Sequence, residues 1–295
     1  EKPFGKGITE AQHLDKMLGD LFDESQIFRI DHYLAKETIQ NILTFRFSNN
    51  VFESLWGNKH VERVKIVVHE KNTLEARGNF YDGIGALRDV GQNHMLQMLA
   101  LIAMEDPGGI NAERIRELRS DILEKVLLVD IDKMVRAQYD GYLNEPGVDK
   151  GSETETFFRV TLGVNNDRWA GVPFEFESGK ALAESRVAIE VYFKETERCF
   201  CPEAHEGSHQ NVLTFVIQPN ESIKFRFWFK RPGFGFALDP QDLSFSYERD
   251  LSGVTHDAYE RVLYDCIRGD QTLFTSTKEI MAEWKLITSI MDAWG

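Results

Sequence analysis

Hydrophobic and polar residues follow a helical period at the start of the chain. Leu14, Leu18 and Leu21 recur on one face of an amphipathic helix, and Thr9 followed by Gln12 predicts a capping box at its start. Further segments with apolar residues at helical spacing cover residues 36–47, 89–104, 112–124, 257–268 and 278–294. A glycine at position 269 predicts where the fourth of these helices ends.

In the middle of the chain the period becomes two, which is typical of strands. The segments with this alternation cover residues 156–164, 186–193, 212–218 and 223–230, and a short strand is also expected at 26–30. The chain therefore begins with helices, continues with strands and closes with helices. This order predicts an α+β fold with one large, mainly antiparallel β-sheet and helices packed on one face of it.

The first thirty residues carry more apolar surface than a short helix and strand can bury. The residues concerned are Phe4, Ile8, Leu14, Leu18, Leu21, Ile27 and Ile30. We expect this segment to be the end of a larger unit that packs against it.

Composition excludes several classes of function. The 295 residues are 42% hydrophobic, which allows one large domain or two modest ones. No apolar run is long enough to span a membrane, no signal pattern is present, and three cysteines fit a reducing compartment, so we interpret the protein as cytoplasmic. The formal charge of −14 argues against a nucleic-acid partner, and any anionic ligand needs a local cluster of cations.

Two groups of polar residues are candidates for a site. Asp31, His32, Tyr33 and Lys36 lie in the turn between a predicted strand and a predicted helix, where backbone N–H groups and positive charge suit a phosphate. The alternative is an exposed polar turn in which Asp31 only caps the helix.

The second group lies in the strongly apolar helix at residues 89–104. Here His94 is accompanied by Asp89 and Asn93, and burying three polar groups without partners would be costly. A pocket is the simpler explanation, although a histidine in such a helix is more often a hydrogen-bonded core residue.

A metal site is a weaker hypothesis. Cys199, Cys201, His205 and His209 are side chains that zinc accepts, but their spacing is irregular. A solvated hairpin loop explains the same residues, and we predict no metal.

Several sequence blocks, taken together and in order, resemble the glucose-6-phosphate dehydrogenase family along the whole chain. The blocks are Glu1-Lys2-Pro3-Phe4-Gly5, the signature from Arg29 to Lys36, Arg88-Asp89-Val90 with Gln92-Asn93-His94, Lys180-Ala181-Leu182, Gln218-Pro219-Asn220-Glu221 and Asp257-Ala258-Tyr259-Glu260-Arg261. The eight-residue signature is highly specific, whereas the block that begins at Gln218 is weak alone.

The resemblance implies an enzyme that oxidises glucose 6-phosphate at C1 to 6-phosphogluconolactone and passes hydride to NADP, in the pentose phosphate pathway. It makes His94 the general base and Asp31 the residue that orients the imidazole. The remaining implied roles are phosphate binding by His32, Tyr33 and Lys36, sugar-hydroxyl binding by Glu70 and Asp89, a place for Lys2 between sugar and nicotinamide, and completion of the substrate side by Lys180 and Gln218.

Some positions depart from the family pattern. Ser185 stands where a basic residue is common, with Arg186 as a possible substitute, and Glu177 also occupies an often basic position. Val216 replaces an arginine that helps to form a second NADP site in some members, so we do not predict that site.

The resemblance also implies a domain organisation. No G-x-G-x-x-G turn follows a strand, so residues 1–30 are interpreted as the last helix and strand of a nucleotide-binding domain that is otherwise missing. Residues 31–295 would form the substrate-binding, catalytic and dimerisation domain, with a homodimer formed through the large sheet. We expect little turnover from this truncated chain alone. The alternative is a non-catalytic subunit that binds sugar phosphate or serves oligomerisation, although such a subunit has no use for a general base.

Overall fold

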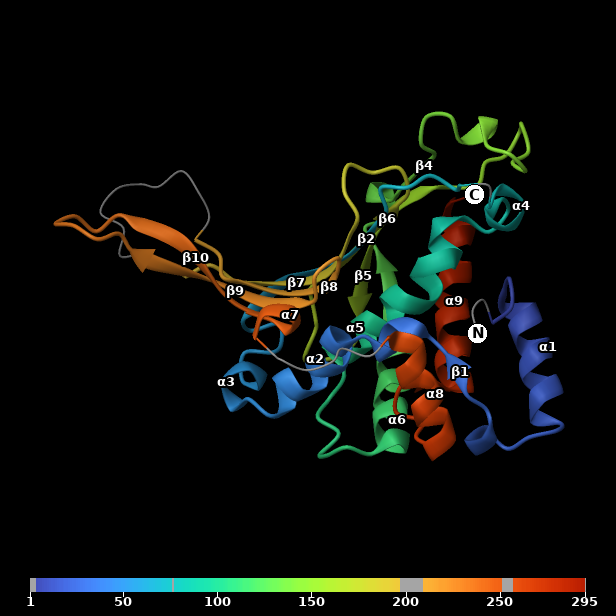
Figure 1. The fold of residues 1–295 in the computed structure, drawn as a ribbon, viewed down its shortest axis with the longest axis horizontal. Coiled ribbons are helices and arrows are strands. Elements are labelled where there is room, and N and C mark those ends of the chain that lie inside the picture. Colours follow the sequence, from blue (N-terminus) through green and yellow to red (C-terminus); the bar gives the residue numbers. More distant parts are fainter. Residues whose placement is uncertain (1–3, 76, 197–208, 251–256, 295) are drawn as a thin grey trace.

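A nine-stranded sheet forms the centre of the computed structural model, which describes residues 4–75, 77–196, 209–250 and 257–294 (Figure 1). The strand order is β10-β9-β8-β7-β2-β6-β5-β3, and β4 also pairs with β5. The strands are β2 (Val61–His69), β3 (Val126–Val129), β4 (Val135–Ala137), β5 (Phe157–Val164), β6 (Phe174–Gly179), β7 (Arg186–Phe193), β8 (Val212–Gln218), β9 (Ser222–Lys230) and β10 (Leu238–Ser246). Among these pairs only β2 and β6 run parallel, which confirms the predicted mainly antiparallel sheet.

Helices cover one face of this sheet, as the sequence predicts (Figure 1). The helices are α1 (Ile8–Gly19), α2 (Glu37–Phe47), α3 (Asn50–Glu53), α4 (Gly78–Tyr81), α5 (Leu96–Ala103), α6 (Ala112–Leu123), α7 (Tyr247–Asp250), α8 (Ala258–Arg268) and α9 (Thr277–Trp294). Helix α5 is apolar on nearly every side and is buried along its whole length. It packs on α6 and on the segment Leu87–Met95, which contacts β6, β2 and α9. The core therefore lies between the sheet and these helices.

A second, two-stranded sheet joins distant parts of the chain. Strand β1 (Arg29–Ile30) pairs antiparallel with β11 (Phe274–Thr275), which precedes α9. This pairing holds the end of β1, and the turn that follows it, beside α8 and α9.

The structure corrects four details of the sequence-based prediction. The capping box at Thr9 is wrong, because α1 begins at Ile8 after Gly7, and the backbone N–H of Lys6 donates to the Glu10 carboxylate instead. Helix α1 ends at Gly19, so Leu21 lies beyond it and is 71% exposed.

The other two corrections concern β1 and α2. The strand predicted at 26–30 is only two residues long, because Glu24–Gln26 forms a 3-10 turn. Helix α2 begins at Glu37, with Lys36 as its N-cap residue.

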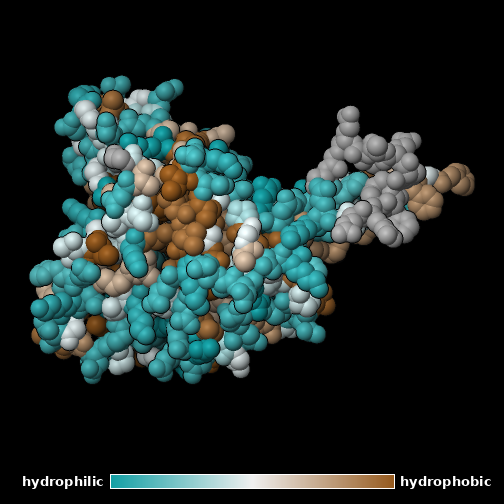
Figure 2. Space-filling view, turned by 180° about the vertical axis from the view of Figure 1, so that it is seen from behind, coloured by the Kyte–Doolittle hydropathy of each residue, from teal (hydrophilic) through white to brown (hydrophobic). Residues whose placement is uncertain are grey.

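The hairpin of β9 and β10 extends away from the body of the molecule (Figure 1). Its tip carries exposed aromatic side chains, among them Phe234 and Phe236, and the tip appears as a hydrophobic spot in an otherwise mostly hydrophilic part of the surface (Figure 2). Within the described residues, no helix has the length and apolar character needed to cross a membrane.

Candidate active site

The turn after β1 places the first group of candidate residues. The backbone of Asp31 leaves the strand, and His32–Ala35 then forms one 3-10 turn before α2. Asp31 Oδ1 accepts the backbone N–H of Tyr33 at 3.0 Å, so the carboxylate caps this turn. The capping role predicted for Asp31 is therefore present, and it leaves the carboxylate able to bind a second group.

His94 lies on Leu87–Met95, a π-helical segment that continues into α5. Such segments are rare and occur often at functional sites. The Asn93 side-chain oxygen accepts the backbone N–H of His94 at 2.6 Å, and the Asn93 amide donates to the Asp89 carbonyl at 3.1 Å. The Asn93 side chain therefore finds its partners in the backbone of its own segment.

His94 and Asp31 form a buried hydrogen-bonded pair. The distance from His94 Nδ1 to Asp31 Oδ1 is 2.5 Å, and the two residues are 1% and 4% exposed. Burial of Asp31 opposes its ionisation, but the charge of His94 and the hydrogen bonds from His94 and Tyr33 outweigh this effect and hold the pKa of Asp31 below its ordinary value. An ionised Asp31 selects the tautomer of His94 that carries its proton on Nδ1, and Nε2 is then the basic nitrogen.

A cavity of about 440 Å³ lies beside this pair. Its walls come from the turn after β1, the end of β2, the segment around α4 and the π-helical segment. The lining residues are His32, Tyr33, Glu70, Arg77, Phe80, Ile84, Arg88, Asp89, Val90, Asn93 and His94. The volume is that of a small-molecule site.

Aromatic rings surround His94 at the cavity wall. The Tyr33 ring stacks on the His94 ring with 4.0 Å between centroids, and His32 approaches His94 edge-on at 4.9 Å. Tyr259 of α8 stacks on His32 at 5.7 Å. Burial, together with the charges of Glu70, Asp31 and Asp89, raises the pKa of Tyr33, so its hydroxyl stays protonated and can donate a hydrogen bond.

The structure brings together most of the predicted site residues, but not all of them. His32, Tyr33, Glu70, Asp89 and His94 line the cavity. Asp31 lies behind His94, and Lys36 follows the same turn at the start of α2, outside the lining.

Two further predicted residues stand apart from the lining. Lys180 is 8% exposed, forms an ion pair with Glu70 and lies 5.4 Å from the centre of the Tyr81 ring, so it supports the cavity through Glu70. Gln218 lines a different cavity, on the other face of the sheet. Lys2 lies outside the described residues.

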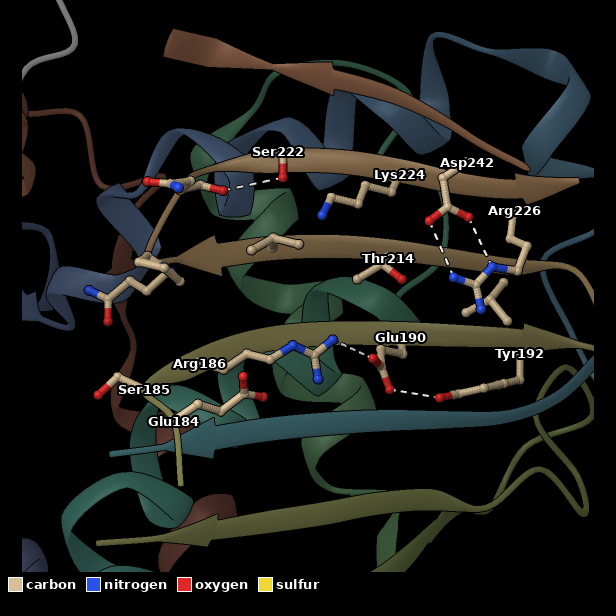
Figure 3. A pocket seen from close by; sticks show the side chains of 15 residues that line it. Glu184, Ser185, Arg186, Glu190, Tyr192, Thr214, Ser222, Lys224, Arg226 and Asp242 are labelled. Carbon is tan, nitrogen blue, oxygen red and sulfur yellow. Dashed lines mark hydrogen bonds and ion pairs between the residues drawn. The ribbon is translucent and has the colours of Figure 1, made fainter. Parts of the chain in front are cut away.

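That other cavity has a volume of about 470 Å³ and is lined by side chains of β7, β8 and β9 and of the segments beside them (Figure 3). Its cations are matched by carboxylates. Arg186 forms an ion pair with Glu190, and Arg226 hydrogen-bonds Asp242 at 2.9 Å. This pairing leaves little net positive charge for an anion.

Sequence reasoning assigned no site role to five lining residues, of which two are cations. Arg77 and Arg88 flank the segment that contains Gly83 and Gly85, both with left-handed backbones. Arg88 Nε donates to the Ile84 carbonyl at 2.6 Å, which fixes its side chain at the cavity edge. The signal that could have found them is the need for local cations in a protein of charge −14. Phe80, Ile84 and Val90, the three apolar lining residues, carry no comparable signal.

Groups that could hold a metal overlap with the same pair. Among the described residues, one ligand atom each of Asp31, His32 and His94 lie within 4.8 Å of one another. The hydrogen bond between Asp31 and His94 already explains this proximity. Of the predicted loop cluster, Cys199, Cys201 and His205 lie outside the described residues, and the ring of His209 packs 4.4 Å from Trp228.

The fold and the site together define a class of protein. A large, mainly antiparallel sheet covered by helices on one face, with a buried histidine and aspartate pair beside a cavity, defines an α+β protein with a candidate acid–base site. KijD10, a 3-ketoreductase from Actinomadura kijaniata, has this fold, with a TM-score of 0.57 and 10% identity over 99% of this chain and 69% of that one. At this identity the likeness shows the fold alone.

The particular family follows from closer matches. Residues 43–295 match the family model for the glucose-6-phosphate dehydrogenase C-terminal domain, and residues 1–41 match the model for its NAD binding domain. The chain belongs to the glucose-6-phosphate dehydrogenase family, as its sequence blocks predict.

Curated relatives and solved structures agree with this assignment. Glucose-6-phosphate 1-dehydrogenase of Chlamydia trachomatis is 39% identical over all of this chain and 70% of its own length, and a cytoplasmic isoform from Solanum tuberosum is 38% identical over 99% of this chain and 57% of its own length. A solved glucose-6-phosphate dehydrogenase in complex with glucose-6-phosphate is 34% identical, with a TM-score of 0.91 over 99% of this chain and 61% of that chain. The chain thus spans between 57% and 70% of these relatives.

Proposed function

We propose that the chain forms the substrate-binding and catalytic part of a glucose-6-phosphate 1-dehydrogenase, an oxidoreductase of glucose metabolism. The observation that carries this proposal is the buried pair of His94 and Asp31 at the wall of a 440 Å³ cavity. Family membership supplies the substrate, and the solved relative named above as a complex with glucose-6-phosphate supports it. NADP is proposed as the hydride acceptor.

His94 acts as the general base in this proposal. Its Nε2 takes the proton of the C1 hydroxyl while C1 loses hydride, so the C–H bond breaks, a C=O bond forms and the product is 6-phosphogluconolactone. Asp31 holds the imidazole by Nδ1 and stabilises the imidazolium that forms. Both partners are buried, which strengthens this electrostatic support.

The substrate lies with its phosphate toward the turn after β1. His32, Tyr33 and Lys36 bind the phosphate there, next to the start of α2, and Arg77 and Arg88 add positive charge at the cavity edge. Glu70 and Asp89 bind sugar hydroxyls, with Lys180 holding Glu70 through its ion pair. Lys2 is proposed to lie between sugar and nicotinamide, and Gln218, at the end of β8, to complete the substrate side as the family resemblance implies.

The 295 residues do not fit a whole dinucleotide. The sequence contains no G-x-G-x-x-G turn, and both arginines of the second cavity are paired with carboxylates. When bound, NADP would accept the hydride. Residues 1–30 are proposed to belong to the nucleotide-binding domain and residues 31–295 to the substrate domain, and the chain alone is expected to show little turnover.

We also propose a homodimer and a cytoplasmic location. The face of the sheet opposite the helices carries charged side chains of both signs, which suits contact with a second copy of itself. The location is supported by relatives from Solanum tuberosum and Arabidopsis thaliana that are named cytoplasmic.

A non-catalytic sugar-phosphate-binding or oligomerisation fragment is the second candidate. The absence of the dinucleotide turn from the 295 residues favours it for the chain as it stands. The geometry of His94 and Asp31 argues against it, since binding alone does not need a base held in one tautomer.

Calorimetric titration with glucose 6-phosphate tests the proposal. The chain should bind the sugar phosphate, and Lys36→Ala should weaken binding by about tenfold or more, because a hydrogen bond to a charged group contributes about 1.5–3 kcal/mol. Lys59→Ala, an exposed lysine at the opposite end of β2 from Glu70, is the matched control and should bind normally.

A titration with NADP completes the design. No NADP binding together with sugar-phosphate binding would establish a substrate site formed by this chain. Unchanged affinity in Lys36→Ala would show that the phosphate lies elsewhere.

A further inference from the structure

A second, much smaller cavity borders the same histidine and aspartate pair. Its volume is about 30 Å³, enough for one water molecule. Asp31, Gln92 and Glu283 supply polar groups to its wall, whereas Ile30 and Ile280 supply apolar ones. Glu283 comes from α9, more than 180 residues away from Asn93 in the sequence, and sequence reasoning did not single it out.

Asp31 needs a donor on this side. Its Oδ1 is occupied by His94 and by the backbone N–H of Tyr33. Its Oδ2 is buried and meets no hydrogen-bond partner among the residues that the structure describes. A buried carboxylate oxygen without a donor is costly, so a donor inside the cavity would be stabilising.

Glu283 is the acidic group that faces this cavity. It is 1% exposed, and its two oxygens accept the side-chain amides of Gln92 at 3.0 Å and Gln97 at 2.7 Å. Neither hydrogen bond brings a positive charge to the carboxyl group. A proton on Glu283 would give the cavity the donor that Asp31 lacks.

The charges around Glu283 favour that proton. Glu279 of the same helix, Arg119 of α6, Asp31 of the turn and Arg29 of β1 are the charged groups at Glu283 or at its cavity. Arg119 Nε lies 2.8 Å from Glu279, and Arg29 pairs with Asp15 and Glu24, so each cation already has a carboxylate.

Burial raises the pKa of Glu283 well above its ordinary value. The charges of Glu279 and Asp31 raise it further, against the lowering effects of the Gln97 hydrogen bond and of Arg119. Three carboxyl groups in one buried region cannot all ionise cheaply, and the pKa is raised at Glu283 but lowered at Asp31.

We propose that Glu283 is a positioning residue for the catalytic pair: as a neutral acid it donates, through one water molecule in the 30 Å³ cavity, a hydrogen bond to Asp31 Oδ2. The donated bond keeps Asp31 ionised with Oδ1 turned to His94. It also weakens the pull of Asp31 on the imidazole proton and so lowers the pKa of His94 toward the range of a useful base. The inference rests on the proposed role of His94, but its test does not need turnover.

The first measurement is infrared spectroscopy of the chain at neutral pH. The difference between wild type and Glu283→Gln should contain the C=O stretching band of a protonated carboxylic acid. Absence of that band overturns the proposal, because Glu283 would then be ionised. Glu283→Gln is nearly isosteric with wild type, so this measurement remains decisive even if Glu283→Met does not fold.

The second measurement is the pKa of His94, which nuclear magnetic resonance of its ring determines as the pH is varied. Glu283→Gln keeps a neutral donor and should leave this pKa unchanged, whereas Glu283→Met removes the donor and should raise it by about half a unit to one unit. A lower pKa in Glu283→Gln, or no change in Glu283→Met, would overturn the proposal.

Glu155→Gln is the matched control. Glu155 is another buried carboxyl whose pKa is raised by burial, but it accepts the backbone N–H of Leu87 at the far end of the π-helical segment, so the pKa of His94 should not move. Titration of the same variants with glucose 6-phosphate separates the two proposals. An acid band and a shifted His94 without sugar-phosphate binding would remove the proposed function and keep the role of Glu283.

Discussion

At the scale of single residues, the site depends on how polar groups tolerate burial. Asp31 Oδ1 accepts hydrogen bonds from the backbone N–H of Tyr33 and from the ring N–H of His94. The same oxygen therefore caps the 3-10 turn and orients His94. A substitution of Asp31 can therefore change both the cap of the turn and the charge beside His94. The variant must therefore keep the cap while it removes the charge.

Asp31→Asn meets that need, because asparagine is also a good cap residue. Loss of the carboxylate beside the ring should lower the pKa of His94 by about 1–3 units. Nuclear magnetic resonance titration of the His94 ring checks this result. Asp20→Asn, an exposed residue after α1, should leave the His94 titration in place, and an unmoved His94 in Asp31→Asn would mean that the pair is not ionised as described.

Glu283 predicts a pH dependence of stability with a definite sign. Its pKa is raised in the folded state, so the folded chain keeps a proton that the unfolded chain releases above about pH 4.3. The contribution of Glu283 to the free energy of unfolding is present at low pH. It is lost as the pH rises toward the pKa of the folded state, at up to about 1.4 kcal/mol per pH unit.

Urea unfolding at about pH 5 and about pH 8 measures this effect. The glutamine of Glu283→Gln never ionises. The free energy of unfolding of this variant, relative to that of wild type, should therefore be higher at the higher pH. An equal difference at both pH values would contradict the raised pKa.

Residue types predicted part of this site and could not predict the rest. Asp31, His32 and His94 stand out because polar groups interrupt apolar segments and because they match a specific signature. Arg88 and Glu283 reach the pair only through tertiary packing, and a charged residue on an amphipathic helix ordinarily faces solvent. The helical period does place Glu283 on the apolar face of α9, between Ile280 and Ile287, but its residue type ordinarily indicates solvent exposure.

At the scale of elements, local signals predicted the long helices and four strands of the large sheet, whereas β2, β3, β4, β6 and β10 were missed. Strands β7 and β8 lie at the predicted residues, and α8 begins after Asp257 and ends at Gly269 with φ of 70° as predicted. Strand β2 was missed because its second half is buried nearly throughout, so the alternation that marks a strand is absent. The capping box predicted at Thr9 was wrong because Thr9 is the second residue of α1, and the same residue pattern can occur inside a helix.

Helix α8 connects a local cap to the site. Asp257 accepts the N–H of Tyr259 at 2.8 Å, and the ring of Tyr259 stacks on His32. Asp257→Ala should lower the free energy of unfolding by about 0.5–2 kcal/mol and weaken sugar-phosphate binding less than Lys36→Ala does. Asp257→Asn keeps the cap and should behave as wild type in urea unfolding and calorimetry. Equal stability of the alanine and asparagine variants would show that the cap contributes little.

At the scale of the whole molecule, charge distribution decides where an anion can bind. The chain carries 14 more acidic than basic residues, yet two arginines, two histidines and one lysine gather around the cavity and the turn next to it. On the open face of the sheet, arginines are instead paired with carboxylates (Figure 3). The two faces therefore differ in kind: the helical side suits a sugar phosphate, and the open side suits a surface of mixed charge.

That difference leads to a prediction about assembly. Thr214 lies in the middle of the open face on β8, where a long cation would meet the partner's sheet if two copies pack face to face (Figure 3). Thr214→Arg should therefore weaken a dimer by tenfold or more in analytical ultracentrifugation, because desolvating an unpaired charge at an interface costs several kcal/mol, on the order of 2–5. Thr44→Arg, on the solvent side of α2, is the matched control and should leave the dimer intact. A wild-type chain that stays monomeric, or a dimer that tolerates arginine at position 214, would place any association on another surface.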